Sequence, residues 1–250
     1  MEQPSVPTLH HLASSQSMRV LWALEEIVES HRYKDGFKYN LVLYKRRYGP
    51  NPDLQAVFPI GKSPIMTVEE NDGRGPKVYQ LNQYPGVLAE SILIMEFVNE
   101  TYANRIWDAE PEDEKRAKYL DVLAHNTLSV KIISALLFDI IPAMMPFGIR
   151  HLLRLMVNPI VNYWKNDMQP SFQVMEDVLS ETKPWFAGSS MGLADFNMSW
   201  CMDMATQRGY FDGKKYPKVQ AWVDRVYARP AYQRALEKGG TYDLKTFGTR

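Results

Sequence analysis

The chain has 250 residues, of which 45% are hydrophobic and 23% are charged, a composition typical of a globular protein with one large or two modest domains. Its 29 Lys and Arg residues balance its 29 Asp and Glu residues, which argues against a nucleic-acid-binding protein, because such proteins carry a basic excess or stripe. The single cysteine, Cys201, excludes an internal disulfide framework and a cysteine-rich metal site.

The first residues, MEQPSVPTLHH, contain neither a basic cluster nor an apolar core. A secretory signal needs both, so we expect a cytoplasmic protein in a reducing compartment. We find no run of about 18 apolar residues, the length of a transmembrane helix. The most apolar segment, 132–161, is interrupted by charged residues and prolines. We expect it to form a pair of core helices joined by a bend, with peripheral attachment to an intracellular membrane as the alternative.

The first hundred residues alternate between strand and helix patterns, which favours an α/β domain with a thioredoxin-like order of elements. The polar segment 70–86 is punctuated by Gly and Pro and predicts a long hairpin extension, in which 78–81 pair. The other predicted elements, in chain order, are strand 8–12, helix 20–28, strand 37–43, short helix 50–58, strand 65–68, strand 87–88 and a helix from Ser91.

The rest of the chain has almost entirely helical periodicity, after an acidic, proline-containing linker over 104–114. This pattern predicts an all-α C-terminal domain. The predicted helices are 119–137, 149–179 with a kink or break near Pro159, 193–207, one started by Pro217 and a last one from Pro230.

Four short motifs occur in this order along the chain: SQSMRVLWALEE (15–26), FPIGKSP (58–64), LAES (88–91) and RPAYQRALEKGG (229–240). Together they resemble the glutathione transferase superfamily, and most closely its serine-type enzymes of fungi and bacteria, a group that includes an endoplasmic-reticulum-associated yeast transferase. The resemblance implies a thioredoxin-like glutathione-binding domain over 1–104. It also implies a helical domain over 113–250 that contributes the site for a small hydrophobic electrophile.

Enzymes of this family lower the pKa of the glutathione thiol, which requires a hydrogen-bond donor and an electropositive site beside the sulfur. A hydroxyl at the start of the first helix meets both needs, because a helix N-terminus carries about half a positive charge. Ser15 matches the first serine of the family's Ser-x-Ser-x-Arg pattern, so the resemblance implies that Ser15 is catalytic. Ser14 is the second candidate, five residues before the matching Arg19, and Ser17 is the third. Alternatively, all three serines are helix caps.

The resemblance also implies five residues that bind glutathione. Ser63 and Pro64 match the family's cis-proline pair, in which the backbone of Ser63 pairs with the cysteinyl backbone of glutathione as an added strand would. Glu90 can neutralise the γ-glutamyl ammonium, and Ser91, at the opening of its helix, can hold the neighbouring carboxylate. Lys62 can reach the glycyl carboxylate or remain solvated.

Other conspicuous residues have structural explanations. Asp195 matches the buried aspartate of the family's folding motif, although Gly192 stands where relatives carry Ser or Thr, so a weaker helix cap is expected there. His10 and His11 are adjacent on a strand and point to opposite faces, so they form no metal pair, and we expect no metal.

Three alternatives to a detoxifying transferase remain open. The first is a non-catalytic glutathione-binding or regulatory protein on the same fold. The second is a glutathione-dependent tailoring enzyme or isomerase of secondary metabolism. The third, a thiol transferase, is disfavoured because the turn before the first helix holds serines and no cysteine. The resemblance further implies a homodimer.

Overall fold

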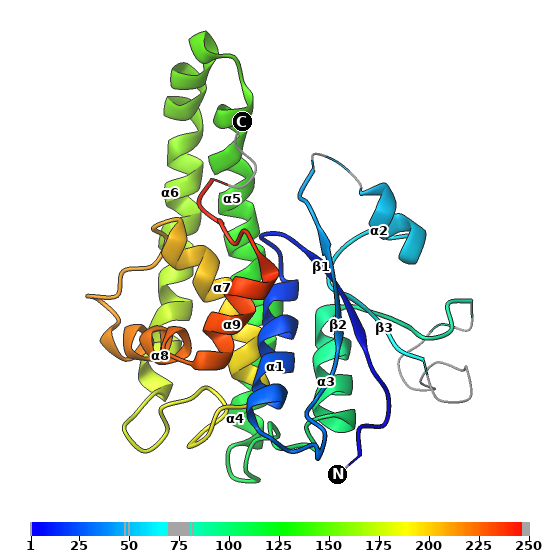
Figure 1. The fold of residues 1–250 in the computed structure, drawn as a ribbon. Helices are drawn as coiled ribbons and strands as arrows, with labels where there is room; N and C mark the ends of the chain where they lie inside the picture. The colour runs from blue at the N-terminus through cyan, green and yellow to red at the C-terminus, as the bar shows by residue number, and fades with distance from the viewer. Residues whose placement is uncertain (1, 48, 50, 70–80, 82, 247–250) are drawn as a thin grey trace. The chain divides into compact units, whose positions relative to one another are not determined.

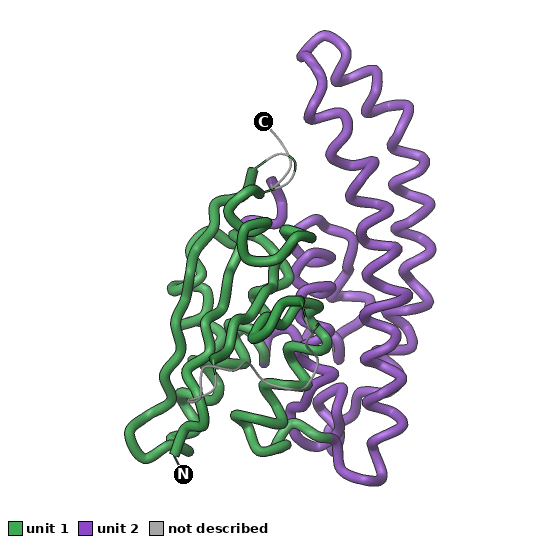
Figure 2. Tube along the Cα trace, turned by 90° about the vertical axis from the view of Figure 1, so that its right-hand side faces the viewer, with its two compact units in different colours: residues 1–108, 226–242 green, residues 109–225, 243–250 purple. Residues whose placement is uncertain are grey.

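A computed structural model describes residues 2–47, 49, 51–69, 81 and 83–246. The chain divides into two compact units, which Figure 2 distinguishes by colour. Unit 1 comprises Met1–Asp108 and Val226–Tyr242, and unit 2 comprises Ala109–Arg225 and Asp243–Arg250. The hairpin extension predicted over 70–86, including its pairing at 78–81, falls largely on residues outside the described part.

Unit 1 is built on a four-stranded mixed sheet with the strand order β2-β1-β3-β4. Strands β1 (Thr8–Leu12) and β2 (Asn40–Tyr44) are parallel. Strands β3 (Ile65–Thr67) and β4 (Val87–Ala89) are antiparallel to their neighbours. The predicted order of strands is confirmed, although β2 begins three residues later than the expected strand 37–43.

The helices of unit 1 that follow the strands are α1 (Ser17–Glu29), α2 (Pro52–Val57) and α3 (Ser91–Thr101). Helix α1 packs against β1 and α3. Helix α2 starts where the sequence provides both N-terminal signals: Pro52 occupies the first turn, and the Asn51 side chain accepts the Asp53 N–H at 3.1 Å. These elements give the thioredoxin-like order that the alternating pattern predicts.

Helix α9 (Pro230–Gly239) belongs to unit 1, although it follows all the helices of unit 2 in sequence. It packs along α1, where Glu25, which is fully buried, accepts from Arg234 at 3.0 Å and from Lys238 at 2.6 Å. Burial opposes the ionisation of Glu25, but the hydrogen bonds from Lys238, Tyr39 and Arg234 keep its pKa below the ordinary value. We expected one helical domain over 113–250. Helix α9 lies within that range but packs on α1, so it belongs to unit 1.

Unit 2 consists of helices. The expected helix over 119–137 is a continuous run, but one turn of it is a π-helix. The helix expected over 149–179 is also continuous through Pro159 and Pro170, so of the predicted kink or break near Pro159 the break is absent. The starts predicted at Leu193 and Pro217 are confirmed. The elements are α4 (Glu114–Val122), the π-helical turn η1 (Leu123–Leu128), α5 (Ser129–Met144), α6 (Phe147–Val178), α7 (Leu193–Gln207) and α8 (Pro217–Tyr227).

Asp195 organises the core of unit 2. It is fully buried, and its carboxylate accepts the indole N–H of Trp222 at 2.7 Å and the backbone N–H groups of Phe186 at 2.8 Å, Ala187 at 3.2 Å and Gly192 at 2.9 Å. Burial raises the pKa of Asp195, and these hydrogen bonds oppose that rise. Gly192, the N-cap residue of α7, has no side chain that could cap the helix. The Asp195 carboxylate accepts the Gly192 N–H, so Asp195 supplies the side-chain contact at this cap.

The apolar segment 132–161 differs from expectation in the exposure of its second helix. It does form two helices joined by a bend: α5 and α6 run side by side as an antiparallel pair (Figure 1). However, the first turns of α6 are mostly exposed and do not form a core. In addition, Glu114–Met144 is long and apolar enough to cross a membrane by length and composition. A core helix of a globular protein passes the same test, so the expectation that no segment spans a membrane stays a prediction.

Candidate functional site

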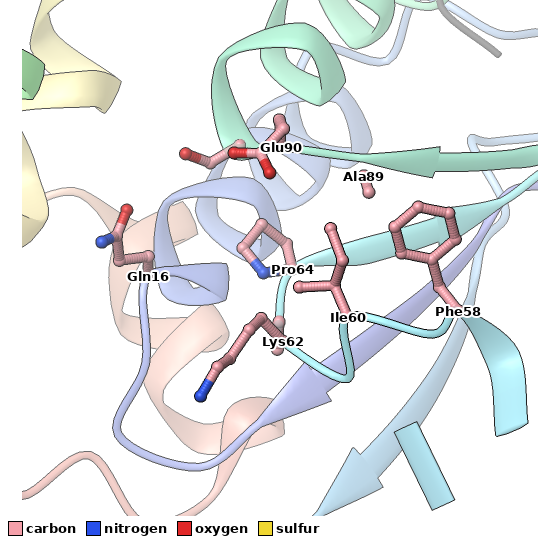
Figure 3. A pocket seen from close by; sticks show the side chains of 9 residues that line it. Gln16, Phe58, Ile60, Lys62, Pro64, Ala89 and Glu90 are labelled. Atoms are coloured by element: carbon pink, nitrogen blue, oxygen red, sulfur yellow. The ribbon is translucent and has the colours of Figure 1, made fainter. Parts of the chain in front are cut away.

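A surface pocket of about 220 Å³ lies in unit 1, where the loop before β3 meets the start of α3. All five residues predicted to bind glutathione line it. Figure 3 shows Glu90 and Lys62 on either side of Pro64, with Gln16 at the start of α1 beside them. The lining residues are Gln16, Phe58, Ile60, Lys62, Ser63, Pro64, Ala89, Glu90 and Ser91.

Glu90 and Ser91 form the β4–α3 junction. Ser91 is the first residue of α3, and Glu90 precedes it with φ 71° and ψ 117°. A positive φ is unfavourable for a residue with a side chain, and such strain often accompanies functional sites. The first N–H groups of a helix lack partners within the helix. The junction can therefore hold a cation on the Glu90 carboxylate and an anion on the opening of α3.

The loop that carries Ser63 and Pro64 is fixed to β1. The Ser63–Pro64 peptide bond is cis, as expected. The Ser63 hydroxyl donates to the carbonyl of His10 at 2.8 Å and accepts the N–H of Leu12 at 3.0 Å. These two hydrogen bonds of the Ser63 hydroxyl hold the loop against β1, next to the pocket that Ser63 lines.

Four lining residues were not anticipated from the sequence: Gln16, Phe58, Ile60 and Ala89. Three of them belong to the motifs FPIGKSP and LAES, so their position could have been inferred from the motifs. Gln16 lies between two candidate serines, and its side-chain oxygen accepts from Arg19 at 3.2 Å. Lys62 is exposed at the rim and brings one positive charge to the pocket.

The candidate catalytic serines do not line this pocket. Ser14 and Ser15 are only 5% and 6% exposed. The hydroxyl of Ser14 donates to the carbonyl of Thr241 at 3.3 Å, and the N–H of Ser14 reaches the same oxygen at 3.2 Å. The oxygen of Ser15 accepts the N–H of Ser17, at the start of α1, at 3.2 Å. The N-cap residue of α1 is Gln16, and its side chain does not cap this helix, so Ser15 lies one residue before the cap.

A chain of hydrogen bonds leads from Ser15 to a buried histidine. The Ser15 and Ser17 hydroxyl oxygens are 2.8 Å apart, and the Ser17 oxygen is 2.9 Å from Nδ1 of His11. His11 is 1% exposed. Burial lowers its pKa to about 4, and a hydrogen bond to the backbone of Gly239 opposes this shift. His11 is therefore neutral at pH 7.

The Gly239 bond assigns the protons in this chain. A backbone contact that raises the pKa of an imidazole is one to which the ring donates an N–H. His11 then has its other nitrogen, Nδ1, free to accept from Ser17. The Ser17 hydroxyl donates its hydrogen bond to His11, so the Ser17 oxygen accepts from Ser15. The Ser15 hydroxyl thus points toward Ser17.

His10 and His11 do point to opposite sides of β1, as expected. Nδ1 of His10 lies 2.8 Å from the Tyr44 hydroxyl, and burial lowers the pKa of His10. Cys201 lies in α7 of unit 2, is 1% exposed, and donates from its thiol to the carbonyl of Ala124 at 3.3 Å. Neither arrangement supplies a reactive thiolate or a metal pair.

Comparison with known proteins gives consistent results. Residues 164–230 match the family "Glutathione S-transferase, C-terminal domain". The chain is 24% identical to glutathione S-transferase 1 of Saccharomyces cerevisiae over 237 residues, which cover 92% of this chain and 94% of the relative. It is 27% identical to glutathione S-transferase 3 of Schizosaccharomyces pombe over 234 residues, covering 92% and 86%.

Solved structures show the same fold. A glutathione S-transferase from Actinobacillus pleuropneumoniae has a TM-score of 0.67 at 23% identity, and 97% of each chain is covered. A glutathione transferase homolog from Lodderomyces elongisporus, solved with two GSH per subunit, has a TM-score of 0.67 at 16% identity, covering 94% of this chain and 99% of that one.

Proposed function

Since the chain belongs to the glutathione transferase superfamily, we propose that it binds glutathione in the unit 1 pocket and conjugates the thiolate to small hydrophobic electrophiles. The observation that carries this proposal is the convergence of Glu90, Ser91, Lys62 and the Ser63–Pro64 backbone in one pocket. Those groups complement the charges and the peptide backbone of glutathione.

The glutathione molecule has an order of charges that suits this arrangement. Its γ-glutamyl ammonium would pair with Glu90, and the adjacent carboxylate would accept from Ser91 and the opening of α3. Its cysteinyl backbone would pair with the backbone of Ser63. Its glycyl carboxylate would lie toward Lys62.

The thiol chemistry is proposed for Ser15. The thiol loses its proton to solvent, the thiolate attacks the electrophilic carbon, a sulfur–carbon bond forms, and the leaving group departs with its electron pair. Ser15 would stabilise the thiolate by turning its O–H from Ser17 to the sulfur. The start of α1 adds a positive potential at the same place. Ser14 is the second candidate, although its hydroxyl is held by Thr241.

The test is a conjugation assay with glutathione and a generic aromatic halide, accompanied by calorimetry of glutathione binding. Ser15→Ala should lower turnover on the order of 100-fold, as expected for loss of one oriented donor, and should retain binding. Ser14→Ala is the matched control, because it removes a neighbouring hydroxyl, and should keep turnover within a few-fold. Unchanged turnover in Ser15→Ala would refute the role of Ser15.

The Ser15–Ser17 contact favours a second candidate function. A hydroxyl that stays bonded to Ser17 would leave a protein that binds glutathione without activating it. Calorimetric binding with no turnover toward any electrophile tested would support that regulatory function. Absence of binding would remove both candidates.

We also propose a homodimer. Apolar side chains that are 38% to 57% exposed run along α4 and α5 of unit 2, at Tyr119, Val122, Val130, Ile133 and Leu137. Such a face is typical of an interface between subunits. Light scattering should give the mass of two 28.9 kDa chains, and the mass of a single chain would contradict the proposal.

A further inference from the structure

Arg46 binds the turn between β1 and α1, which carries the candidate catalytic serines. It lies two residues after the end of β2, and its guanidinium donates from Nε to the carbonyl of Ala13 at 3.1 Å and from Nη2 to the carbonyl of Ser14 at 2.8 Å. Two successive carbonyls therefore share one planar group, whose rigid fork of donors an ammonium lacks. Burial lowers the pKa of Arg46, but a guanidinium stays protonated at pH 7.

The turn is strained at Ser14, whose φ is 52°. A left-handed conformation is uncommon for a residue with a side chain, and it persists only where the surrounding structure holds it. The two carbonyls that Arg46 binds belong to the peptide groups before and after Ser14. The carbonyl of Thr241 adds a further contact, because it accepts the N–H of Ser14 at 3.2 Å. Both peptide groups that flank Ser14 are thus held from outside the turn.

The same contacts determine where Ser15 lies. Arg46 holds the peptide group before Ser15 through the Ser14 carbonyl, and the carbonyl of Ser15 accepts the N–H of Met18 at 3.2 Å. With both of its peptide groups held, Ser15 has its Cβ in a fixed position, and only its hydroxyl can turn. A hydrogen bond to a carbonyl also polarises the peptide group, so the guanidinium makes the N–H of Ser15 a stronger donor at the opening of α1.

We propose that Arg46 is a positioning residue for the conjugation reaction, a role that rests on the proposed function of Ser15. By fixing the turn, Arg46 keeps the Ser15 hydroxyl within reach of the glutathione sulfur and adds to the positive potential at the start of α1. Arg46 acts through the turn, because its guanidinium binds the two carbonyls and Arg46 is not among the residues that line the pocket. Its loss should therefore affect the thiolate and leave the binding of glutathione unchanged.

The first test is kinetic and uses the full chain with glutathione and an aromatic halide. Arg46→Met removes the fork and the charge, and should lower kcat about ten-fold while the KM for glutathione changes less than about two-fold, because misplacing a reacting group costs rate and not binding. The pKa of the bound glutathione thiol, measured from the ultraviolet absorbance of the thiolate, should rise. Arg46→Lys keeps the charge without the fork and should fall between the two proteins.

Arg47→Met is the matched control. Arg47 is the next residue and is exposed, and its contact with Asp53 is a surface ion pair of 3.8 Å, which contributes little. Its kcat and its thiol pKa should equal those of the unchanged protein. Thermal unfolding checks that all variants are folded.

A double-mutant cycle distinguishes positioning from a general structural role. If Arg46 acts through Ser15, adding Arg46→Met to Ser15→Ala should lower kcat by less than about two-fold, because the group that Arg46 positions is already absent. A further ten-fold loss in the double variant would mean that Arg46 acts elsewhere, and would overturn the proposal.

Amide hydrogen exchange measures the hold on the turn without any substrate. Peptides that cover residues 13–18 should exchange faster in Arg46→Met than in the unchanged protein or in Arg47→Met. Equal exchange in all three proteins would overturn the proposal, and so would an unchanged kcat in Arg46→Met when the parent protein is active. A parent protein without turnover would refute the proposed function, and with it the catalytic part of this role, whereas exchange would still show whether Arg46 holds the turn.

Discussion

Acidification should destabilise this protein through His11. The ring is neutral and buried between Ser17 and Gly239, and its pKa is lowered from 6.5 to about 4. The unfolded chain therefore binds a proton at higher pH than the folded protein does. The stabilising contribution is fully present above pH 6.5 and is lost as the pH falls from 6.5 toward 4.

The size of the effect follows from the two pKa values. Each pKa unit corresponds to about 1.4 kcal/mol, so the free energy of unfolding should fall by about 2 kcal/mol between pH 7 and 5 and about 3 kcal/mol by pH 4 because of His11 alone. Protonation also removes the acceptor of the Ser17 hydroxyl. The fixed direction of the Ser15–Ser17 hydrogen bond should therefore be lost over the same pH range.

Urea unfolding at pH 7, 5 and 4 measures this contribution. His11→Gln cannot titrate, so its stability should depend on pH less steeply by these amounts, while the carboxyl groups common to both proteins cancel in the difference. His151→Gln, which removes an exposed histidine, is the control and should follow the unchanged protein. Parallel curves for the unchanged protein and His11→Gln would refute the reasoning.

Two further substitutions test the core of unit 2 and the pocket of unit 1. Asp195→Ala leaves the Trp222 indole and three buried backbone N–H groups without their acceptor, so the free energy of unfolding in urea should fall by on the order of 3 kcal/mol or more. Asp195→Asn should cost less, because its amide keeps one oxygen. Equal losses for the two variants would contradict this. Glu90→Gln removes the charge proposed to meet the glutathione ammonium and should weaken glutathione binding about ten-fold in calorimetry. The exposed Glu237→Gln should have no effect, and equal affinities for all three proteins would remove Glu90 from the site.

Much of the fold could be predicted because its signals are local. Proline at the first turn begins α8 and α9 at the positions expected, since its fixed φ suits that place and its missing N–H costs nothing there. The alternation of strand and helix patterns gave the order of elements in unit 1. The five predicted binding residues come from two short motifs, and the cis peptide between Ser63 and Pro64 fits the motif that predicted it.

Other features depend on residues far apart in the chain. The sequence pattern of α9 predicts a helix but not its place in unit 1, which depends on Arg234 and Lys238 reaching Glu25 more than 200 positions earlier. The direction of the Ser15 hydroxyl depends on Ser17 and on His11 from β1. A hydroxyl can turn toward any nearby acceptor, so only the folded neighbours decide its direction.

The pair of helices α5 and α6 shows the same division most clearly. Composition determined that 132–161 is apolar and helical, and on that basis we expected core helices. Whether an apolar helix face is buried depends on what packs against it, and Leu152, Leu155 and Met156 are left exposed by the α5–α6 contact. The sequence by itself thus determined the elements and the chemistry of the pocket. Only the tertiary structure decided which apolar faces are covered and which polar groups meet, because burial and hydrogen bonding are properties of neighbours that the chain brings together only on folding.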